Sequence, residues 1–355
     1  MINVTKTFFP PIEDYQKQVQ RIWDNQWLTN NGKLYKELSD KLTKHLGINY
    51  IIPMTNGTMP LHIALNAFAD QGEVITTPFS YVATTAGIVW EKCTPVFVDI
   101  HSEYLTIDET KIEAAITDKT TAIVATHVYG NPCDVEAIGA IAKKHNLKVI
   151  YDAAHCFGVK YKGQSIFNYG DVSTCSFHAT KLFHTGEGGA LFCQNVETRQ
   201  EMFYRHNFGH NGPEHYHGLG TNAKMSELQA AMGLSLLPYM KHISSERQRV
   251  CEYYNQHLDS KNLSKLKIRD GTDWNYAYYP VVLKSENHLL EVKARLKSED
   301  INPRRYFYPS LEGLPYIDSK KCPKARNIAE RVLCLPLYTS LAEHQQNKII
   351  RILNA

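Results

Sequence analysis

The chain has 355 residues and a formal net charge of +3, with 43% hydrophobic and 21% charged residues. This composition is typical of a globular enzyme and excludes a disordered chain, and so small a positive charge argues against nucleic acid as a partner. The length predicts two domains within one compact unit. No run of about 18 apolar residues occurs and the N-terminus has no signal peptide, so the sequence predicts neither a membrane span nor secretion.

Cysteine usage points to the same kind of protein. The eight cysteines are Cys93, Cys133, Cys156, Cys175, Cys193, Cys251, Cys322 and Cys334. None forms a C-x-x-C pair, and several lie in apolar runs typical of strands. This pattern predicts buried, reduced thiols in a cytoplasmic protein and no disulfide framework.

The first half of the chain alternates predicted helices with predicted strands. Helices are expected near 12–26, 33–46, 58–69, 82–93, 109–116 and 134–145, and strands at 51–54, 73–78, 95–99, 121–126 and 149–152. This alternation favours the α/β class, with a mostly parallel sheet between two layers of helices.

The second half changes its pattern near Pro238. Before it we expect strands at 174–176 and 190–193, a glycine-broken loop at 206–217 and a helix from Lys224. After it we expect a second helix, strands at 279–283, 304–308 and 332–337, and helices at 286–298 and 341–353. We therefore predict a large domain at 1–238 and a smaller α+β domain at 239–355.

One lysine lies in a turn between two apolar strands. Lys181 is followed by the glycine-rich return Gly186-Glu187-Gly188-Gly189. Lysine is rarely buried without a task, and a lysine beside other cations or in apolar surroundings can become a nucleophile. The hydroxyls of Ser176 and Thr180 lie beside it, as a bound phosphate would require. A surface hairpin with a solvated lysine is the alternative.

An aspartate elsewhere in the sequence favours the interpretation of Lys181 as a nucleophile. Asp152 ends the apolar strand Val149–Tyr151, and ligands of open α/β sheets lie at the carboxyl ends of strands. A lysine Schiff base and an aspartate on the pyridinium nitrogen are the pair that pyridoxal 5′-phosphate (PLP) requires. A helix cap would explain Asp152 but not the distant lysine.

Thr55-Asn56-Gly57-Thr58 joins a predicted strand to a predicted helix. Such a turn presents free N–H groups and the positive end of a helix to an anion. We assign Gly57 and Thr58 to the PLP phosphate; an ordinary helix cap at Thr55 or Thr58 is the alternative.

Other polar residues have weaker assignments. His127 follows a strand, and we interpret it as a buried, satisfied imidazole. The histidines of 206–217 lack the spacing of metal ligands, so we predict no metal and a mobile loop over the site. Arg304 and Arg305 could pair with substrate anions or form a solvated strand end.

Seven segments in a fixed order give the chain a resemblance to a known family. They are Trp27–Gly32, Thr55–Thr58, Thr77–Thr84, His127–Pro132, Tyr151–His155, Ser176–Gly189 and Gly220–Ala231. Over nearly its whole length the chain resembles the DegT-like nucleotide-sugar aminotransferases, which are fold type I PLP enzymes. A sister group with histidine at the lysine position dehydrates its substrate, and Lys181 disfavours that group.

The resemblance implies further roles. Tyr81 would stack on the cofactor ring with Ala154 on its other face, and His155 would contact the cofactor, at its ring hydroxyl. Thr29 would border the sugar site, where a plain connector is an equal alternative. Asn222 would reach the cofactor phosphate of a partner subunit, which implies a homodimer.

These expectations define one function. Lys181 would hold PLP and shuttle a proton while Asp152 stabilises the protonated ring. The substrates would be L-glutamate and a nucleotide-linked keto sugar, and Ser176–Gly189 looks closest to enzymes that aminate C4 of dTDP-4-keto-6-deoxy-D-glucose for surface polysaccharides. UDP-, GDP- or 3-keto sugars, a PLP-dependent dehydratase or decarboxylase, and a non-catalytic sensor of sugar nucleotides remain alternatives.

Overall fold

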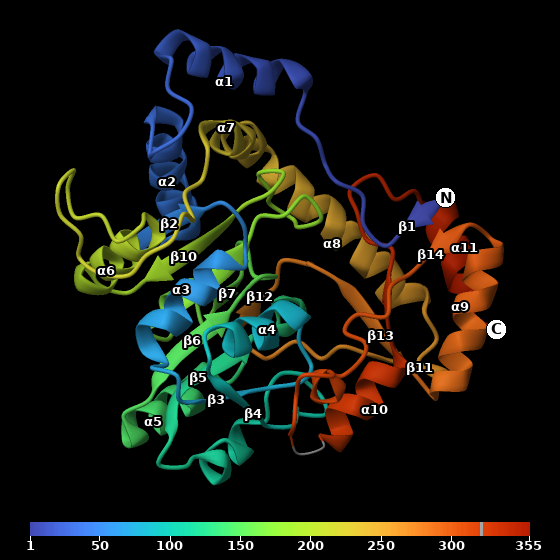
Figure 1. The fold of residues 1–355 in the computed structure, drawn as a ribbon. Helices are drawn as coiled ribbons and strands as arrows, with labels where there is room; N and C mark the ends of the chain where they lie inside the picture. The colour runs from blue at the N-terminus through green and yellow to red at the C-terminus, as the bar shows by residue number, and fades with distance from the viewer. Residues whose placement is uncertain (320–321) are drawn as a thin grey trace.

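A seven-stranded sheet occupies the centre of the first part of the chain in the computed structural model, which describes residues 1–319 and 322–355 (Figure 1). In spatial order the strands are β2 (Tyr50–Met54), β10 (Gly189–Cys193), β9 (Val172–Ser176), β6 (Lys148–Asp152), β5 (Thr120–Thr126), β3 (Glu73–Thr76) and β4 (Thr94–Phe97). Only β10 runs antiparallel to its neighbours. The expected α/β class with a mostly parallel sheet is confirmed.

Strand β5 shows why the sheet strands are apolar throughout. Ala122 and Val124 pack into one core cluster, whereas Ile123 and Ala125 pack into another. Successive side chains of a strand point to opposite faces, so a sheet covered on both sides needs apolar residues at every position. Both faces of this sheet are therefore buried.

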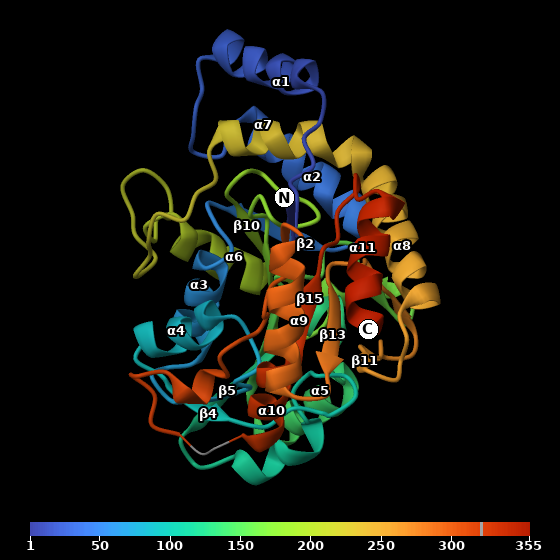
Figure 2. The same cartoon turned by 90° about the vertical axis from the view of Figure 1, so that its right-hand side faces the viewer.

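Helices cover those two faces (Figures 1 and 2). One face packs on α3 (Met59–Phe68), α4 (Val82–Trp90) and α6 (Val196–His206), and the other packs on α2 (Lys33–Leu46), α5 (Val135–His145) and α7 (Glu227–Leu236). Helix α1 (Ile12–Asn25) lies against α7. Short strands β7 (Lys160–Tyr161), β8 (Gln164–Ser165) and β12 (Thr272–Asp273) form a separate small sheet.

The last third of the chain builds its own core. Strands β11 (Leu263–Lys265), β13 (Tyr279–Leu283) and β15 (Val332–Leu335) form an antiparallel sheet, which α8 (Met240–His257), α9 (Glu286–Ser298), α10 (Pro323–Arg331) and α11 (Glu343–Asn354) accompany. The N-terminal strand β1 (Ile2–Asn3) pairs with β14 (Ile301–Asn302), so Ile2 belongs to this second core. The division at residue 238 stays a prediction.

Three local expectations differ from the structure. Residues 109–116 are helical, but they form two short 3₁₀ helices, Glu109–Lys111 and Glu113–Ala115, instead of one continuous α-helix. Residues 304–308 form a turn in which only Arg304 bridges to Cys334, because the strand of this segment ends earlier, at Asn302. Helix α7 begins at Glu227 rather than Lys224, because Ser226 and Gln229 form a capping box there.

Pro238 does not separate two helices by a loop. It lies in the 3₁₀ turn Leu237–Tyr239, which joins α7 directly to α8. Cys93, Cys133, Cys156, Cys175, Cys193, Cys251 and Cys334 are buried free thiols, as expected. Within residues 1–319 and 322–355, no helix has the length and apolarity needed to cross a membrane.

Candidate active site

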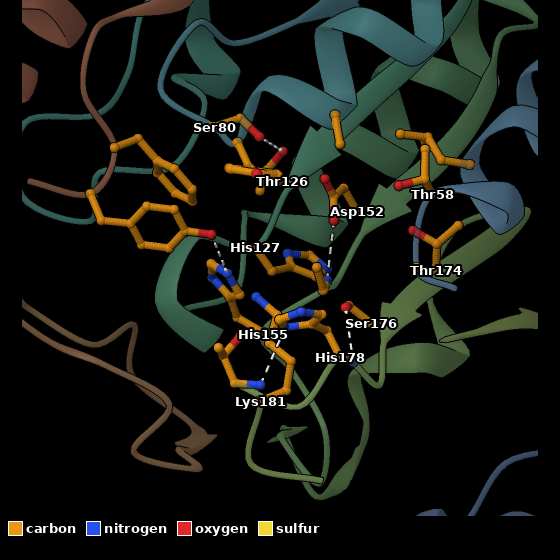
Figure 3. A pocket seen from close by; sticks show the side chains of 18 of the residues that line it. Thr58, Ser80, Thr126, His127, Asp152, His155, Thr174, Ser176, His178 and Lys181 are labelled. Atoms are coloured by element: carbon orange, nitrogen blue, oxygen red, sulfur yellow. Dashed lines mark hydrogen bonds between the residues drawn. The ribbon is translucent and has the colours of Figure 1, made fainter. Parts of the chain in front are cut away.

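The strands β5, β6 and β9 end side by side at one edge of the sheet, at Thr126, Asp152 and Ser176. A cavity of about 250 Å³ opens at this edge and is lined by all three residues and by Lys181 (Figure 3). Carboxyl ends of parallel strands are where α/β sheets bind ligands. The two residues with predicted catalytic roles, Lys181 and Asp152, therefore face the same cavity.

Lys181 lies in the turn between β9 and β10. Its Nζ donates a hydrogen bond to the Tyr278 hydroxyl at 3.4 Å and lies 5.7 Å from the centre of that ring. Tyr278 comes from the last third of the chain and is buried. The turn is held by backbone bonds from Lys181 N to His178 O and from Thr185 N to Phe177 O. The amine is thus partly shielded and faces the cavity.

The Asp152 carboxylate is 8% exposed and has two donors. Its Oδ2 accepts a hydrogen bond from Thr84 Oγ1 at 2.6 Å, and its Oδ1 accepts one from Ala154 N at 3.1 Å. Burial raises the pKa of Asp152, while the Thr84 and Ala154 donors and the charge of Lys181 oppose that rise. The carboxylate keeps lone pairs for a third donor in the cavity.

Gly57 lies against the end of β9. A Cβ added at Gly57 would lie 2.7 Å from Ser176 Cβ and 2.9 Å from Ser176 Cα, so no side chain fits at residue 57. Gly57, Thr58 and Ser176 line the cavity together. Thr58 is the N-cap residue of α3, but its side chain makes no capping bond. Asn56 Oδ1 accepts from the N–H groups of Thr58 and Met59 instead.

His155 is buried in an aromatic cluster at the cavity wall. Its Nδ1 accepts from Tyr129 N at 3.2 Å and its Nε2 lies 3.3 Å from the Tyr306 hydroxyl. Burial, with the charges of Lys181 and Arg304, holds the pKa of His155 well below its usual value. The neutral ring therefore carries its proton on Nε2.

His127 is buried, as expected, but only one of its two ring nitrogens has a hydrogen-bond partner among the described residues. Its Nδ1 accepts from Cys133 N at 3.0 Å, and its ring stacks on Tyr151 with centres 4.5 Å apart. In the described part of the chain its Nε2 has no partner. Burial lowers the pKa of His127 to about 3, so it stays neutral.

Tyr81 and Ala154 both line the cavity. Tyr81 is the residue before α4, is 47% exposed, and has its ring centre 6.0 Å from that of Tyr306. A half-exposed aromatic ring at a cavity mouth is available to a flat ligand. The predicted packing of Tyr81 and Ala154 on two faces of a cofactor ring stays a prediction.

The two neighbouring arginines differ. Arg305 donates to Glu286 Oε1 at 2.6 Å and to Glu330 O at 3.0 Å, so it is already paired. Arg304 lines the cavity, and its guanidinium lies 4.4 Å from the centre of the Tyr306 ring. In the described part of the chain no carboxylate pairs with Arg304.

Asn222 does not line this cavity. It is exposed on a connection before α7, where Lys224 Nζ donates to its Oδ1 at 2.7 Å. In the same region His217 pairs with Glu201 and His210 lies against Tyr216. Across residues 1–319 and 322–355, no group of three or more His, Cys, Asp or Glu is arranged to hold a metal ion.

Several cavity residues were missed by sequence reasoning. They are Asn56, Ser80, Thr126, Tyr278 and Tyr306, and Thr84, which donates to Asp152 from helix α4, was missed as well. Asn56, Ser80 and Thr126 carry a signal that could have been used, since each lies at or just after the end of a strand of the sheet. Tyr278 and Tyr306 carry none, because their segments reach the site only through the packing of the two cores.

Comparisons with known proteins agree with this geometry. Residues 11–354 match the DegT/DnrJ/EryC1/StrS aminotransferase family, and the chain belongs to that family. The chain is 42% identical to a dTDP-4-amino-4,6-dideoxy-D-glucose transaminase of Shigella dysenteriae over 348 residues, which cover 96% of this chain and 95% of the relative. It is 38% identical to the transaminase of the same name from Escherichia coli over 366 residues, covering 99% and 98%.

The fold has the same relatives. The crystal structure of DesI in the presence of its TDP-sugar product superposes with a TM-score of 0.93 at 30% identity, covering 99% of this chain and 92% of DesI. Sugar aminotransferases thus share both the sequence pattern and the arrangement of the sheet, and the resemblance inferred from the sequence is confirmed.

Proposed function

We propose that this chain is a PLP-dependent aminotransferase that moves the amino group of L-glutamate to C4 of dTDP-4-keto-6-deoxy-D-glucose. The observation that carries the proposal is the convergence of Lys181 and Asp152 on one cavity from separate strands. The printed names of two relatives that align over nearly the whole chain support the choice of sugar and nucleotide.

The residues present fit PLP. The lack of a Cβ at Gly57 lets the β2–α3 turn pack directly on Ser176, and Gly57, Thr58 and Ser176 line the cavity together, where the two hydroxyls could hold the phosphate. The Asp152 carboxylate could accept a hydrogen bond from the ring nitrogen. His155 has its Nε2 proton at the cavity wall. Tyr81 provides a flat side chain and Ala154 a small one for the ring to pack against. When bound, PLP supplies an electron sink for the bonds of the donor's α-carbon.

The chain's own residues then handle the protons. Lys181 Nζ would act first as a base, taking the proton from the α-carbon of the donor, and then as an acid, delivering that proton to the cofactor. Tyr278 would hold the amine between these steps. Asp152 would keep the ring nitrogen protonated. Arg304 would bind a carboxylate of L-glutamate, because it is the cavity arginine without an acid partner among the described residues.

The test uses purified protein loaded with PLP. L-glutamate should bleach the visible band of the bound cofactor, and the dTDP-keto sugar should then give an amino sugar, identified by mass. Lys181→Ala should abolish turnover, while Lys143→Ala on helix α5 should retain it. Turnover by Lys181→Ala would overturn the proposal, and a dehydrated or decarboxylated product would establish the other class of PLP chemistry.

A panel of keto sugars tests the substrate separately. UDP- and GDP-linked keto sugars and a 3-keto sugar should react more slowly than the dTDP-4-keto sugar. A faster reaction with any of them would correct the substrate but keep the aminotransferase, and no reaction with any sugar would favour a non-catalytic sensor.

We also propose that the working form is a homodimer in which Asn222 of one copy contacts the cofactor phosphate held by the other. Exposed apolar side chains near the N-terminus and in the loop before Asn222 support a second copy: Trp23, Trp27, Leu28, Phe208 and Leu219. Mixing Lys181→Ala with Asn222→Ala subunits should restore activity, because a mixed dimer has one site with both residues. No recovery in confirmed mixed dimers would contradict the trans role.

A cytoplasmic location and a product used for surface polysaccharide, such as O-antigen, are what the resemblance implies, and they stay predictions.

A further inference from the structure

Three hydroxyl groups behind Asp152 form a continuous chain of hydrogen bonds. Thr126 Oγ1 lies 3.0 Å from Ser80 Oγ, Ser80 Oγ lies 2.8 Å from Thr84 Oγ1, and Thr84 Oγ1 lies 2.6 Å from Asp152 Oδ2. Figure 3 shows the contact between Ser80 and Thr126. Thr126, Ser80 and Thr84 are at most 4% exposed, so water does not compete for these bonds.

The topology of the sheet brings these groups together. Strands β3, β5 and β6 are neighbours, so the residues after β3 and at the ends of β5 and β6 meet at one edge. Thr126 is directly opposite Asp152 in the ladder. Thr84 lies in the first turn of α4, where its hydroxyl turns to Ser80 Oγ and Asp152 instead of bonding back to its own helix.

The ionised carboxylate fixes the direction of the chain. A carboxylate has no proton to donate, so the Thr84 hydroxyl donates its single proton to Asp152. Thr84 must then accept from Ser80, and Ser80 must accept from Thr126, because each hydroxyl has only one proton. All three bonds therefore point towards Asp152, and bonds aligned in this way polarise one another.

Neighbouring threonines show that buried hydroxyl groups in this region do not all have hydrogen-bond partners. Within the described residues, the buried hydroxyls of Thr85 and Thr76 have no hydrogen-bond partner. Thr85 follows Thr84 in the same helix and is equally buried. The fold thus leaves adjacent hydroxyls unpaired while it pairs the three that end on Asp152.

We propose that Thr126, Ser80 and Thr84 form a one-way hydroxyl relay that holds Asp152 ionised and oriented towards the cavity. All three are positioning residues, because they act through Asp152. The inference adds to the proposed function by explaining how a buried acid stays charged to meet a protonated ring nitrogen. The relay also anchors the segment that carries Tyr81, since Ser80 precedes Tyr81.

The other ionisable groups around Asp152 should have the same effect on its pKa in the wild-type protein and in each variant. Lys181 lowers the pKa of the Asp152 carboxyl by its charge. Burial raises the pKa of Cys156, Cys175 and Tyr306, which therefore stay neutral. Neutral His155 adds no charge.

The decisive measurement is the pKa of Asp152 in the protein without PLP, from the carboxyl ¹³C NMR shift assigned with Asp152→Asn. Thr84→Val should raise this pKa by about one unit or more, the worth of one hydrogen bond to a charged group. Ser80→Ala should raise it by less, because Thr84 still donates. Thr84→Ser should restore the wild-type value, and Thr85→Val should leave it unchanged.

A second measurement follows the proton in the PLP-loaded protein, through the ¹⁵N NMR shift of ¹⁵N-labelled cofactor. Thr84→Val should move the shift towards that of a neutral ring nitrogen, because a carboxylate without its donor takes the shared proton. An unchanged Asp152 pKa in Thr84→Val or Ser80→Ala, or an equal rise in Thr85→Val, would overturn the relay. Failure of the wild-type protein to bind PLP would overturn the proposed function but leave the first measurement intact.

Discussion

Lys181 and Tyr278 join two distant segments of the chain at the candidate site, with 3.4 Å between the lysine Nζ and the tyrosine oxygen. The lysine comes from the turn after β9, and the tyrosine directly precedes β13. The Lys181 amine is thus held by a hydroxyl from the last third of the chain, and Tyr278 itself lies in a hydrophobic cluster that residues of both parts of the chain form. Any shift of one part against the other would alter the position of the amine.

Replacing Tyr278 by phenylalanine tests this contact. The change removes one acceptor of Lys181 Nζ and keeps the ring that packs on His155, with centres 4.7 Å apart. We expect kcat to fall about tenfold, which corresponds to the loss of one hydrogen bond, with KM for both substrates little changed. Tyr276→Phe, two residues earlier, is the matched control and should keep wild-type kcat. Full kcat in Tyr278→Phe would show that the contact is incidental.

Gly57 should be intolerant of any side chain. The added Cβ of Gly57→Ala would lie 2.7 Å from Ser176 Cβ and push the β2–α3 turn away from β9. We expect PLP affinity to fall at least tenfold, about 1.4 kcal/mol, as measured by cofactor titration. Gly139→Ala in α5 is the control: nothing lies within 4 Å of its added Cβ, so urea unfolding should show a gain of about 0.5–1 kcal/mol.

The pH dependence of stability should carry the signature of His127. Its pKa falls to about 3 in the folded protein because the ring is buried, whereas an unfolded histidine titrates near 6.5. The unfolded state therefore binds one more proton between these values, and the free energy of unfolding should fall by roughly 1.4 kcal/mol per pH unit as pH decreases through that window. Above about pH 6.5 this contribution is constant.

Urea unfolding at several values between about pH 4.5 and 6 measures that slope. His127→Asn should reduce the slope by about one proton while keeping an acceptor for the Cys133 N–H. The exposed His257→Asn should retain the wild-type slope. An identical slope in His127→Asn would mean that His127 binds its proton equally in both states.

The two neighbouring arginines should separate binding from stability. Arg304→Gln should raise KM for L-glutamate tenfold or more, since a charged hydrogen bond contributes about 1.5–3 kcal/mol, and should leave unfolding unchanged. Arg305→Gln should instead cost roughly 1 kcal/mol of stability, because it breaks the contacts with Glu286 and Glu330, and should leave KM unchanged. The opposite assignment would follow if the two effects were exchanged.

The places of the seven strands of the central sheet along the chain were predictable, because a sheet buried on both faces requires apolar runs and these occur between turn residues. Helix α6 and the short strands β1, β7 and β8 were not predicted. The pairing of Lys181 with Asp152 was also predictable, since both follow apolar strands and strand ends gather at one edge. The helical stretch near 109–116 is present as two 3₁₀ helices. The strand predicted at 304–308 was wrong, because β14 ends at Asn302 and the chain turns at residues 306–307.

By itself, the sequence determined the class of fold, the family and the two residues that point to PLP, because these depend on residue types at fixed places along each strand. Only the tertiary structure decided which hydroxyls serve Asp152, that Tyr278 holds Lys181, and that Arg304 rather than Arg305 is open to an anion. Those choices depend on contacts between segments remote in the chain, such as Thr84 with Asp152, and no local pattern encodes them. The packing of both parts of the chain in one shared hydrophobic cluster set the positions of Tyr278 and Tyr306.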